Sequence, residues 1–342
     1  MSKIFVGMSG GVDSSLTAAL LVEQGHEVTG VYMKNWTQDL PGMQCPWAED
    51  LADAKRVAVH LGIAFKVYDF QHEYKRKVVD YMISEYQAGR TPNPDIMCNQ
   101  EVKFKLFLET ALADGAELIA TGHYARVNNG VLKKAKDTKK DQTYFLYRVN
   151  GEALQKTLFP LGEFEKIEVR TMAKARGLVT AHKKDSQGIC FVGSVGIKEF
   201  LSEFVETTPG KVIDNDSHEV VGSHEGAIFY TLGQRHGLSL GGGLPYYVVG
   251  KDMSKNEVYV SRNLNDESMW RHVLPLTDIH WINDAPRDGD ELSVRLRHRG
   301  KLLPVALQGS TLELREAERA AASGQSAVIY RRDEVLGGGI VA

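Results

Sequence analysis

The stretch from Ser9 to Ser15 combines residue types that can bind an anion. It reads SGGVDSS, follows a short apolar run and opens a helical pattern with apolar residues on one face. The glycines let the backbone approach an anion closely, and the serines add hydroxyl donors. The N–H groups of a helix N-terminus point toward the same place, with the positive end of the helix dipole behind them. The stretch therefore predicts phosphate binding.

Two common phosphate loops do not match this motif. It has no lysine, unlike Gly-x-x-x-x-Gly-Lys-Ser/Thr, and it does not follow Gly-x-Gly-x-x-Gly. SGGVDS instead resembles the pyrophosphatase loop of enzymes that split ATP into AMP and pyrophosphate, which implies adenylation. Asp13 would then hold Mg²⁺ on the pyrophosphate. The alternatives are a turn that only joins a strand to a helix, and an ordinary N-cap role for Asp13.

The elements around this motif alternate between strand and helix patterns. We expect strands at 4–7, 28–33, 65–69 and 118–121, and helices at 14–24, 47–61, 73–86, 102–114 and 166–176. Gly25, Gly62 and Gly115 follow three of these helices, at the usual place of a left-handed cap. The alternation predicts an α/β fold with a doubly wound parallel sheet. Ligands bind such sheets beyond the carboxyl ends of the strands, where the serine- and glycine-rich stretch falls.

The second half of the chain has a different pattern. Short β-like runs at 210–214, 248–252 and 257–260 are separated by glycine clusters, and further runs follow at 278–281, 291–297, 302–307, 326–330 and 335–341. Several short strands with turns between them predict a small barrel or sandwich. We expect three domains: a catalytic domain at 1–205, a small β-rich central domain at 206–270 and a β-domain at 271–342.

Composition limits the class of protein. The chain has 342 residues, of which 43% are hydrophobic and 25% charged, as in soluble globular proteins of two or three domains. It has no membrane-spanning run, and we expect no signal peptide because the N-terminus enters a strand directly. Three cysteines are too few and scattered for a disulfide framework, which favours a cytoplasmic location. A net charge of −3 means that local basic patches must bind any nucleic acid.

Two cysteines lie in sequences that suit thiol chemistry. Cys98 follows a proline-stiffened segment and precedes the helix expected at 102–114, and a thiol near a helix N-terminus has a lowered pKa. Asp95 is close enough to share its pocket. Cys190 lies between glycines in a loop, whereas Cys45 has no acid or base beside it and is expected to be inert. Each cysteine taken alone could be a buried, unreactive residue. Two distant thiols and an ATP-activating loop together suit sulfur transfer through a persulfide.

Motifs along the whole chain resemble the bacterial tRNA-specific 2-thiouridylase family, MnmA. They are GMSGGVDSS, YMKNW, GRTPNPDIMCN, KFK, ATGHYAR, KDQTYFL, DSQGICFVG, YTLGQRHGL and LGGG. The resemblance implies an ATP-binding domain of the pyrophosphatase-loop superfamily, a small central domain and a C-terminal β-barrel. It also implies ATP- and persulfide-dependent 2-thiolation of the tRNA wobble uridine, through adenylation of the uracil O2 and release of pyrophosphate and AMP.

The resemblance implies roles for individual residues. ATP would be bound by Gly7, Met8, Ser9, Gly10, Gly11, Val12, Asp13, Ser14, Met33 and Gly122. The flipped-out target uridine would contact Asn93, Pro94 and Asp95, with Asp95 as acid/base. Cys98 would be the nucleophile and Cys190 the persulfide carrier. Contacts with tRNA would come from His123, Lys140, Asp141, Gln142, Arg297, His298 and Gln325.

The same resemblance implies the cofactors and partners. The cofactors are ATP and Mg²⁺. The partners are tRNAs with anticodons of the Lys, Glu and Gln type, and a sulfur donor protein of a cysteine desulfurase relay. His298 occupies a position where many relatives would have a tyrosine, and either ring can stack on a base.

Two basic clusters are suited to neutralising RNA phosphates. The first consists of Lys133, Lys134, Lys136, Lys139 and Lys140, and the second of Arg295, Arg297, His298, Arg299 and Lys301. The first could also be a solvated lysine-rich loop, whereas arginines of one sign on a strand repel each other without a partner. An enzyme that modifies one ring atom must take the base out of its stack, which suits an unpaired anticodon base.

Two rival functions share the phosphate loop. One is another enzyme of the superfamily, such as a 4-thiouridine synthetase or an ATP-dependent amidotransferase-type ligase, which should lack the paired cysteine motifs. The other is a non-catalytic RNA-binding or nucleotide-sensing protein. The thiolated nucleoside that the protein produces in tRNA would distinguish them.

Overall fold

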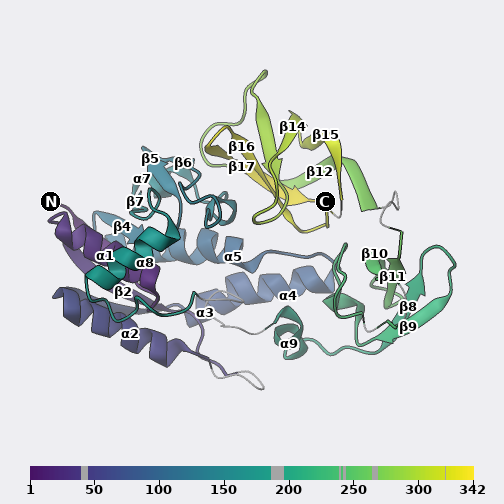
Figure 1. Cartoon of the computed structure of the whole chain (residues 1–342), viewed down its shortest axis with the longest axis horizontal. Helices are drawn as coiled ribbons and strands as arrows, with labels where there is room; N and C mark the ends of the chain where they lie inside the picture. Colours follow the sequence, from purple (N-terminus) through teal and green to yellow (C-terminus); the bar gives the residue numbers. More distant parts are fainter. Residues whose placement is uncertain (40–44, 186–195, 239, 242–243, 264–268, 320) are drawn as a thin grey trace.

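The structure is a computed structural model of the whole chain. It describes residues 1–39, 45–185, 196–238, 240–241, 244–263, 269–319 and 321–342. Cys190 and the rest of the segment 186–195 lie outside the described residues, so the structure does not test the role expected for this cysteine. In Figure 1 the N-terminal part of the chain lies at the left, the C-terminal strands at the upper right and the central strands at the far right.

The N-terminal part contains the expected parallel sheet. Its five strands run in the order β3 (Ala64–Asp69), β2 (Glu27–Lys34), β1 (Lys3–Gly7), β4 (Leu118–Thr121) and β7 (Thr157–Leu158), all parallel. The strand order changes direction at β1, which pairs with both β2 and β4. Such a switch point opens a crevice at the carboxyl ends of the strands, and the Ser9–Ser15 stretch leaves β1 there. The prediction of a doubly wound parallel sheet is confirmed.

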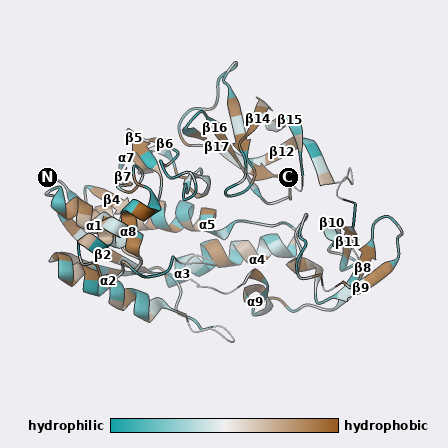
Figure 2. Cartoon of the chain, in the orientation of Figure 1, coloured by the Kyte–Doolittle hydropathy of each residue, from teal (hydrophilic) through white to brown (hydrophobic). Residues whose placement is uncertain are grey.

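Helices cover both faces because successive residues of β1 point to opposite sides. Ile4 and Val6 belong to one buried hydrophobic cluster and Phe5 to another. The first cluster includes residues of α1 (Val12–Glu23), α2 (Trp47–Leu61) and α8 (Lys166–Ala175). The second includes residues of α3 (Gln71–Tyr74), η1 (Lys75–Val79), α4 (Asp80–Gln87) and α6 (Phe107–Ala113). Helices α2 and α4 carry both hydrophilic and hydrophobic residues (Figure 2), as expected when one helix face packs on a sheet.

The helix expected at 102–114 begins eight residues earlier. Helical backbone runs without a break through α5 (Pro94–Met97), a wider π-helical stretch η2 (Cys98–Leu106) and α6. The Asn93 side chain caps it by accepting from the Asp95 backbone N–H at 3.1 Å, and Pro94 occupies the first helical position. Proline is favoured there because its fixed φ suits a helix and its missing N–H would have no partner anyway. Asn93 and Pro94 therefore start this helix.

The C-terminal strands form a closed antiparallel barrel. Its strands are β12 (Trp270–Trp281), β15 (Thr311–Arg319), β14 (Leu303–Gln308), β13 (Leu292–Arg295), β16 (Ser326–Arg331) and β17 (Glu334–Val341), and pairing of β17 with β12 closes it. The expected C-terminal β-barrel is confirmed. Strand β15 was not among the expected runs because its sequence is rich in helix-forming Glu, Leu and Arg. Alternate burial of Leu312 and Leu314 in the barrel core holds it as a strand.

A hairpin from the first half of the chain extends the barrel sheet. It consists of β5 (Arg126–Asn128) and β6 (Val131–Lys133), and Lys133 pairs with Glu334 of β17. This hairpin lies within the expected catalytic domain in the sequence and joins the C-terminal sheet in space. The helix α7 (Gly151–Gln155) and the short turn η3 (Thr143–Phe145) follow it along the chain.

The central part is a small four-stranded sheet. The order is β10 (Tyr247–Asp252), β11 (Glu257–Ser261), β8 (Gly210–Asp214) and β9 (Val220–His224), with β11 and β8 parallel and the other pairs antiparallel. The helix α9 (Ile197–Ser202) precedes this sheet, and the short turn η4 (Ala227–Phe229) follows β9. Within the parts of the chain that the structure describes, no helix is long and apolar enough to cross a membrane.

Candidate nucleotide and tRNA site

The loop from Ser9 to Ser15 has the conformation that an anion cradle needs. Gly10 has a φ of +73°, and a Cβ at this position would lie 2.3 Å from the Asp50 carbonyl oxygen. The Ser14 hydroxyl accepts from the Ser9 N–H at 3.2 Å, and the Ser15 hydroxyl donates to the Gly11 carbonyl at 2.8 Å. Helix α1 begins immediately after Gly11, so its first N–H groups face the loop.

The other residues expected at ATP surround this loop. A Cβ on Gly122 would lie 2.7 Å from the Ser14 backbone nitrogen, so the end of β4 packs directly on the start of α1. A Cβ on Gly7 would lie 3.0 Å from Cε of Met33. The end of β2, which carries Met33, therefore packs closely against the end of β1. Met8 is buried with its sulfur against Gly30 of the sheet, so only its backbone is placed to contact a nucleotide.

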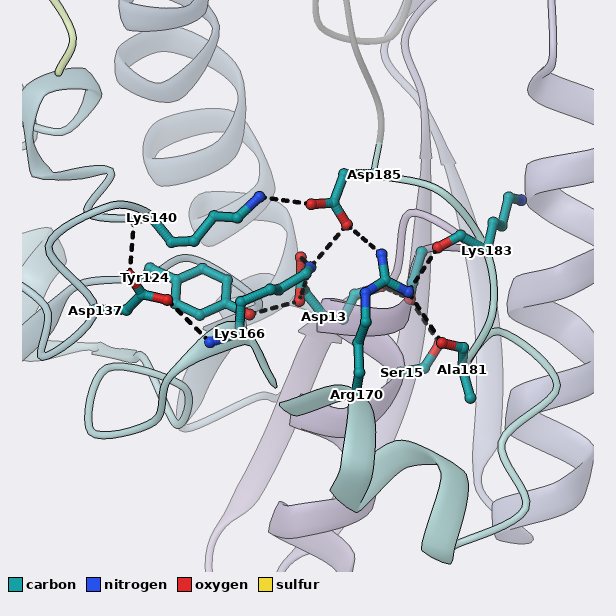
Figure 3. Close-up of polar contacts among 12 residues, drawn as sticks. Asp13, Ser15, Tyr124, Asp137, Lys140, Lys166, Arg170, Ala181, Lys183 and Asp185 are labelled. Atoms are coloured by element: carbon teal, nitrogen blue, oxygen red, sulfur yellow. Dashed lines mark hydrogen bonds and ion pairs between the residues drawn. The ribbon is translucent and has the colours of Figure 1, made fainter. Parts of the chain in front are cut away.

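Asp13 binds a lysine rather than standing open to the crevice (Figure 3). The Nζ of Lys166 lies 2.7 Å from both carboxylate oxygens, and the Tyr124 hydroxyl donates to Oδ1 at 2.9 Å. Lys166 is the first residue of α8, and its side chain is only 12% exposed. In this arrangement an ammonium occupies the cation position at Asp13, so Mg²⁺ bound to this carboxylate would have to displace it.

Asp185 gathers three cations beside the same loop (Figure 3). Its carboxylate lies 2.7 Å from Nζ of Lys140, 2.9 Å from Nζ of Lys166 and 2.7 Å from Nη2 of Arg170. Burial tends to raise the pKa of Asp185, but the ion pairs with Lys140 and Lys166 outweigh it and lower the pKa to about 2. Positive charge is thereby concentrated where the loop would hold phosphates.

Sequence reasoning missed Lys166, Arg170 and Asp185 as site residues. Lys166 and Arg170 are four positions apart in α8, which places them on one helix face. That spacing was the signal that could have found the two cations. No neighbouring residue in the sequence indicates the contacts of Asp185, because Lys140 is 45 positions away.

The segment expected at the target base forms the start of the α5 helix. Asn93 is the N-cap, Pro94 the first and Asp95 the second helical residue. Asp95 and Cys98 are three positions apart and therefore lie on one helix face. Cys98 is fully buried and sits in the second turn. The dipole effect is strongest in the first turn, so the argument for a thiol activated at a helix N-terminus is weaker than the sequence suggested.

Cys45 is buried in the same hydrophobic cluster as Cys98. Its thiol lies 3.7 Å from the Trp36 carbonyl oxygen, which accepts from it. Burial raises the pKa of Cys45, and the nearby acids Asp39 and Asp50 add to this effect. A protonated, buried thiol is consistent with the inert role expected for this cysteine.

His123 lies in an aromatic cluster rather than at the surface. Its ring is 5.5 Å from that of Phe104 and 6.0 Å from that of Phe159, and Nδ1 is 2.7 Å from the Thr121 hydroxyl. Burial lowers the pKa of His123 well below its usual value, with a further contribution from Lys103. The imidazole is therefore neutral at pH 7, and it cannot contact a tRNA phosphate as a cation.

Asp141 and Gln142 are engaged inside the molecule. Asp141 is 3% exposed and pairs with Arg295 of the barrel at 3.0 Å, while its carboxylate also accepts from the Thr143 hydroxyl. The Gln142 side chain accepts from the Tyr124 N–H at 2.9 Å. Both oxygens of this buried carboxylate have partners within the protein, so the Asp141 side chain makes a structural contact here.

The three barrel positions expected at tRNA differ in exposure. The Arg297 side chain is 72% exposed and lies 3.9 Å from Glu318. His298 is half-buried, and its ring lies 4.4 Å from that of Phe145. The Gln325 amide donates to the carbonyl of Thr91 at 3.0 Å. Arg297 is thus the best placed of the three to contact a phosphate.

The first basic cluster is largely ion-paired within the protein. Lys133 lies 3.9 Å from Asp333, Lys136 lies 3.6 Å from Glu168, and Lys140 binds Asp185. These lysines pair with acidic side chains of the protein, whereas those of a freely solvated lysine loop would contact only water. Its net positive field toward RNA is reduced accordingly.

Models of known families match three successive parts of the chain. A tRNA methyl transferase HUP domain matches residues 2–194, a tRNA methyl transferase PRC-barrel domain matches 198–262, and an aminomethyltransferase beta-barrel domain matches 271–341. A solved complex of a 4-thiouridine synthetase with RNA and bound ATP is similar over 59% of this chain and 50% of its own, at 18% identity and a TM-score of 0.40.

Curated relatives are similar over nearly the full length. The tRNA-specific 2-thiouridylase MnmA of Chromobacterium violaceum is 46% identical over 354 residues, which cover 99% of this chain and 92% of the relative. The protein of the same name from Enterococcus faecalis is 43% identical over 356 residues, which cover 99% of this chain and 95% of the relative. On this similarity, together with the three matched domains, the chain belongs to the family of tRNA-specific 2-thiouridylases, MnmA.

Proposed function

We propose that this protein is a tRNA sulfurtransferase that uses ATP to convert the wobble uridine of tRNA to 2-thiouridine. The observation that carries the proposal is the cradle at Ser9–Ser15, bordered by the cations Lys140, Lys166 and Arg170. Such a site suits an enzyme that holds a departing pyrophosphate, because N–H dipoles and cations stabilise developing negative charge. The full-length relatives are named tRNA-specific 2-thiouridylases, which supports 2-thiouridine in tRNA as the product.

The proposed reaction has three nucleophilic steps. The uracil O2 attacks the α-phosphorus of ATP, and pyrophosphate leaves from the cradle. The terminal sulfur of a persulfide on Cys190 then attacks C2, and AMP leaves. The Cys98 thiolate attacks Sγ of Cys190 and breaks its bond to the transferred sulfur, which stays on C2 as 2-thiouridine. This step leaves a Cys98–Cys190 disulfide that a reductant must open. Release of sulfide by Cys98 before the attack on C2 is the alternative order of the thiol steps.

The site residues fit ATP more directly than Mg²⁺. A Cβ at Gly7, Gly10 or Gly122 would meet other protein atoms, so these glycines let the strand ends and the loop pack closely around the start of α1. The first N–H groups of α1 are the donors that suit the phosphates of ATP. A magnesium ion would neutralise charge on the pyrophosphate, and Asp13 is the residue that would hold it. In this structure the two oxygens of Asp13 bind Lys166, so this chain supplies its own cation at that position.

We propose that the target uridine lies against Asn93, Pro94 and Asp95, with Asp95 as acid/base on the uracil. The N-cap bond uses the Asn93 oxygen and leaves the Nδ2 group to donate to a base. Arg297 on the barrel would bind the phosphate backbone. Substrates would be tRNAs with anticodons of the Lys, Glu and Gln type, and the sulfur would come from a donor protein of a cysteine desulfurase relay.

The test is nucleoside mass spectrometry of tRNA after incubation with the protein, ATP and a persulfide donor. We expect 2-thiouridine at the wobble position. A product with 4-thiouridine would identify the rival synthetase, and unchanged tRNA in every condition would contradict the proposed activity.

Variants separate the two halves of the reaction. Cys98→Ser and Cys190→Ser should release pyrophosphate in the presence of tRNA but form no 2-thiouridine. Asp13→Ala should lose pyrophosphate release as well, because the cradle loses the carboxylate that holds a cation there. Retained thiolation in Cys190→Ser would refute the role proposed for that cysteine.

A further inference from the structure

Thr91 is held by residues of two other parts of the molecule. Its N–H donates to the Ser323 carbonyl at 2.9 Å, and its own carbonyl accepts from the Gln325 side chain at 3.0 Å. Its hydroxyl lies 3.1 Å from the Thr231 hydroxyl. Ser323 and Gln325 belong to a barrel loop between β15 and β16, and Thr231 belongs to the central part. Thr91 is buried. Its N–H, its carbonyl and its hydroxyl each contact a residue that is distant in the sequence.

The barrel loop packs closely against Arg90 and Thr91 because its residue 324 is glycine. Gly324 has a φ of +88°, and a Cβ there would lie 2.7 Å from the Thr91 nitrogen and 2.8 Å from Cβ of Arg90. The loop is fixed to the last strand, since Gly324 N–H donates to the Val341 carbonyl at 2.9 Å and Val341 N–H donates to the Gln325 carbonyl at 2.8 Å. The loop is therefore held in place by the last strand of the barrel.

The central contact is anchored in the same way. The Thr231 N–H donates to the Gln234 side chain at 3.0 Å, and the Val248 N–H of β10 donates to the Gln234 carbonyl at 2.9 Å. The position of the Thr231 hydroxyl is therefore set by the central sheet. We refer to Thr231, Ser323, Gly324 and Gln325 together as the Thr91 clamp.

A short stiff link joins Thr91 to the segment proposed to contact the target base. Only Pro92 lies between Thr91 and the helix cap Asn93, and Pro94 follows. Prolines fix φ, so this link cannot absorb a displacement by turning about that angle. A shift at Thr91 would thus be carried to Asn93 and Asp95.

We propose that Thr91 is a positioning residue and that the Thr91 clamp sets the place of the base-contact segment during turnover. Gln325 then acts on the reaction through Thr91, and not only by contacting tRNA. The inference rests on the proposed thiolation activity. Small displacements of a reacting group lower the rate of the chemical step steeply, so loosening the clamp should lower kcat more than it weakens tRNA binding.

The main test is Gln325→Met, which keeps the length of the side chain and removes its donor. We expect kcat for 2-thiouridine formation to fall by about tenfold, while KM for tRNA changes by less than about twofold. Gln308→Met is the matched control, because Gln308 lies on the barrel strand β14 and donates to the surface residue Glu313. A raised KM with unchanged kcat in Gln325→Met would mean a direct tRNA contact and would overturn the inference.

A second pair of variants tests the hydroxyl contact. Thr91→Val should lower kcat, Thr91→Ser should restore most of it, and adding Thr231→Val to Thr91→Val should cause little further loss because the two hydroxyls form one contact. Independent, additive losses would contradict a shared role.

A measurement without catalysis separates this inference from the proposed function. Hydrogen exchange of the Thr91 amide should be slow in the wild-type protein and at least about tenfold faster in Gln325→Met, with an unchanged circular dichroism spectrum. Equal protection in both proteins would overturn the clamp even if thiolation is confirmed. A protein that protects the amide but never thiolates tRNA would instead refute the proposed function.

Discussion

At the scale of single residues, the phosphate loop depends on one glycine more than on its neighbour. Gly10 adopts a left-handed φ and packs against the Asp50 backbone, whereas Gly11 has an extended conformation with φ −94° and ψ 165° that any residue can adopt. A Cβ on Gly11 would meet only the Ser9 hydroxyl, at 3.5 Å. The two glycines are adjacent in the sequence, but only Gly10 occupies a position where another residue would be strained.

The difference between Gly10 and Gly11 should appear in the free energy of unfolding of their alanine variants. Gly10→Ala should reduce the free energy of unfolding by at least about 2 kcal/mol, because the new methyl group meets backbone and the φ is strained. Gly11→Ala should change it by less than about 0.5 kcal/mol. Chemical denaturation of both variants checks this, and equal losses would show that the loop backbone differs from the one described.

At the scale of elements, helix α8 brings its cations to the phosphate loop at the start of α1. Lys166 occupies the first helical position, where the positive end of the helix dipole opposes a cation. The two carboxylates of Asp13 and Asp185 compensate for this placement. The helix thus presents a buried, doubly paired ammonium that a triphosphate could attract.

Removing the Lys166 ammonium should weaken the binding of ligands that carry phosphates and leave the binding of adenosine nearly unchanged. Lys166→Ala should weaken ATP binding by about 10- to 100-fold, the loss expected for a charged hydrogen bond. Binding of adenosine should change by less than about twofold. Calorimetry with both ligands measures this, with Lys136→Ala as a control because Lys136 pairs with Glu168 of the same helix and is half-exposed. Equal weakening of both ligands would point to a general loss of structure.

At the scale of the whole molecule, a buried ion pair joins the N-terminal part of the chain to the C-terminal barrel. Asp141 and Arg295 are 154 positions apart, and their side chains are 3% and 12% exposed. The pair ties the segment after the β5–β6 hairpin to the barrel strand β13. Together with the contacts of Thr91, it ties the barrel to the N-terminal part of the chain.

Breaking this pair should cost much more than breaking one at the surface. Asp141→Asn should lower the free energy of unfolding by about 3–5 kcal/mol, because it leaves the Arg295 charge buried without a counter-ion. Asp114→Asn, which removes the exposed pair with Lys66, should cost no more than about 1 kcal/mol. Denaturant unfolding compares the two, and similar small losses would mean that Arg295 finds another partner.

Signals carried by neighbouring residues were enough to predict much of this protein. The bounds of α2 and β8 match the expected 47–61 and 210–214, and the glycine caps at Gly25, Gly62 and Gly115 all have positive φ. The strand–turn–helix at Ser9–Ser15 was predictable for the same reason, since its glycines and serines act on their own backbone. Local propensity and periodicity decide such elements.

Tertiary structure alone decided the contacts that assemble the site. Lys166 meets Asp13 across 153 positions and Gln325 meets Thr91 across 234, and no local pattern encodes either pairing. The helix start at Pro94 and the strand β15 also differ from expectation, because capping and barrel packing overrode the local signals. The sequence by itself determined the sheet, the phosphate loop and the family resemblance. Packing determined which charges face that loop and what holds the base-contact segment, because those interactions exist only after distant segments are buried against each other.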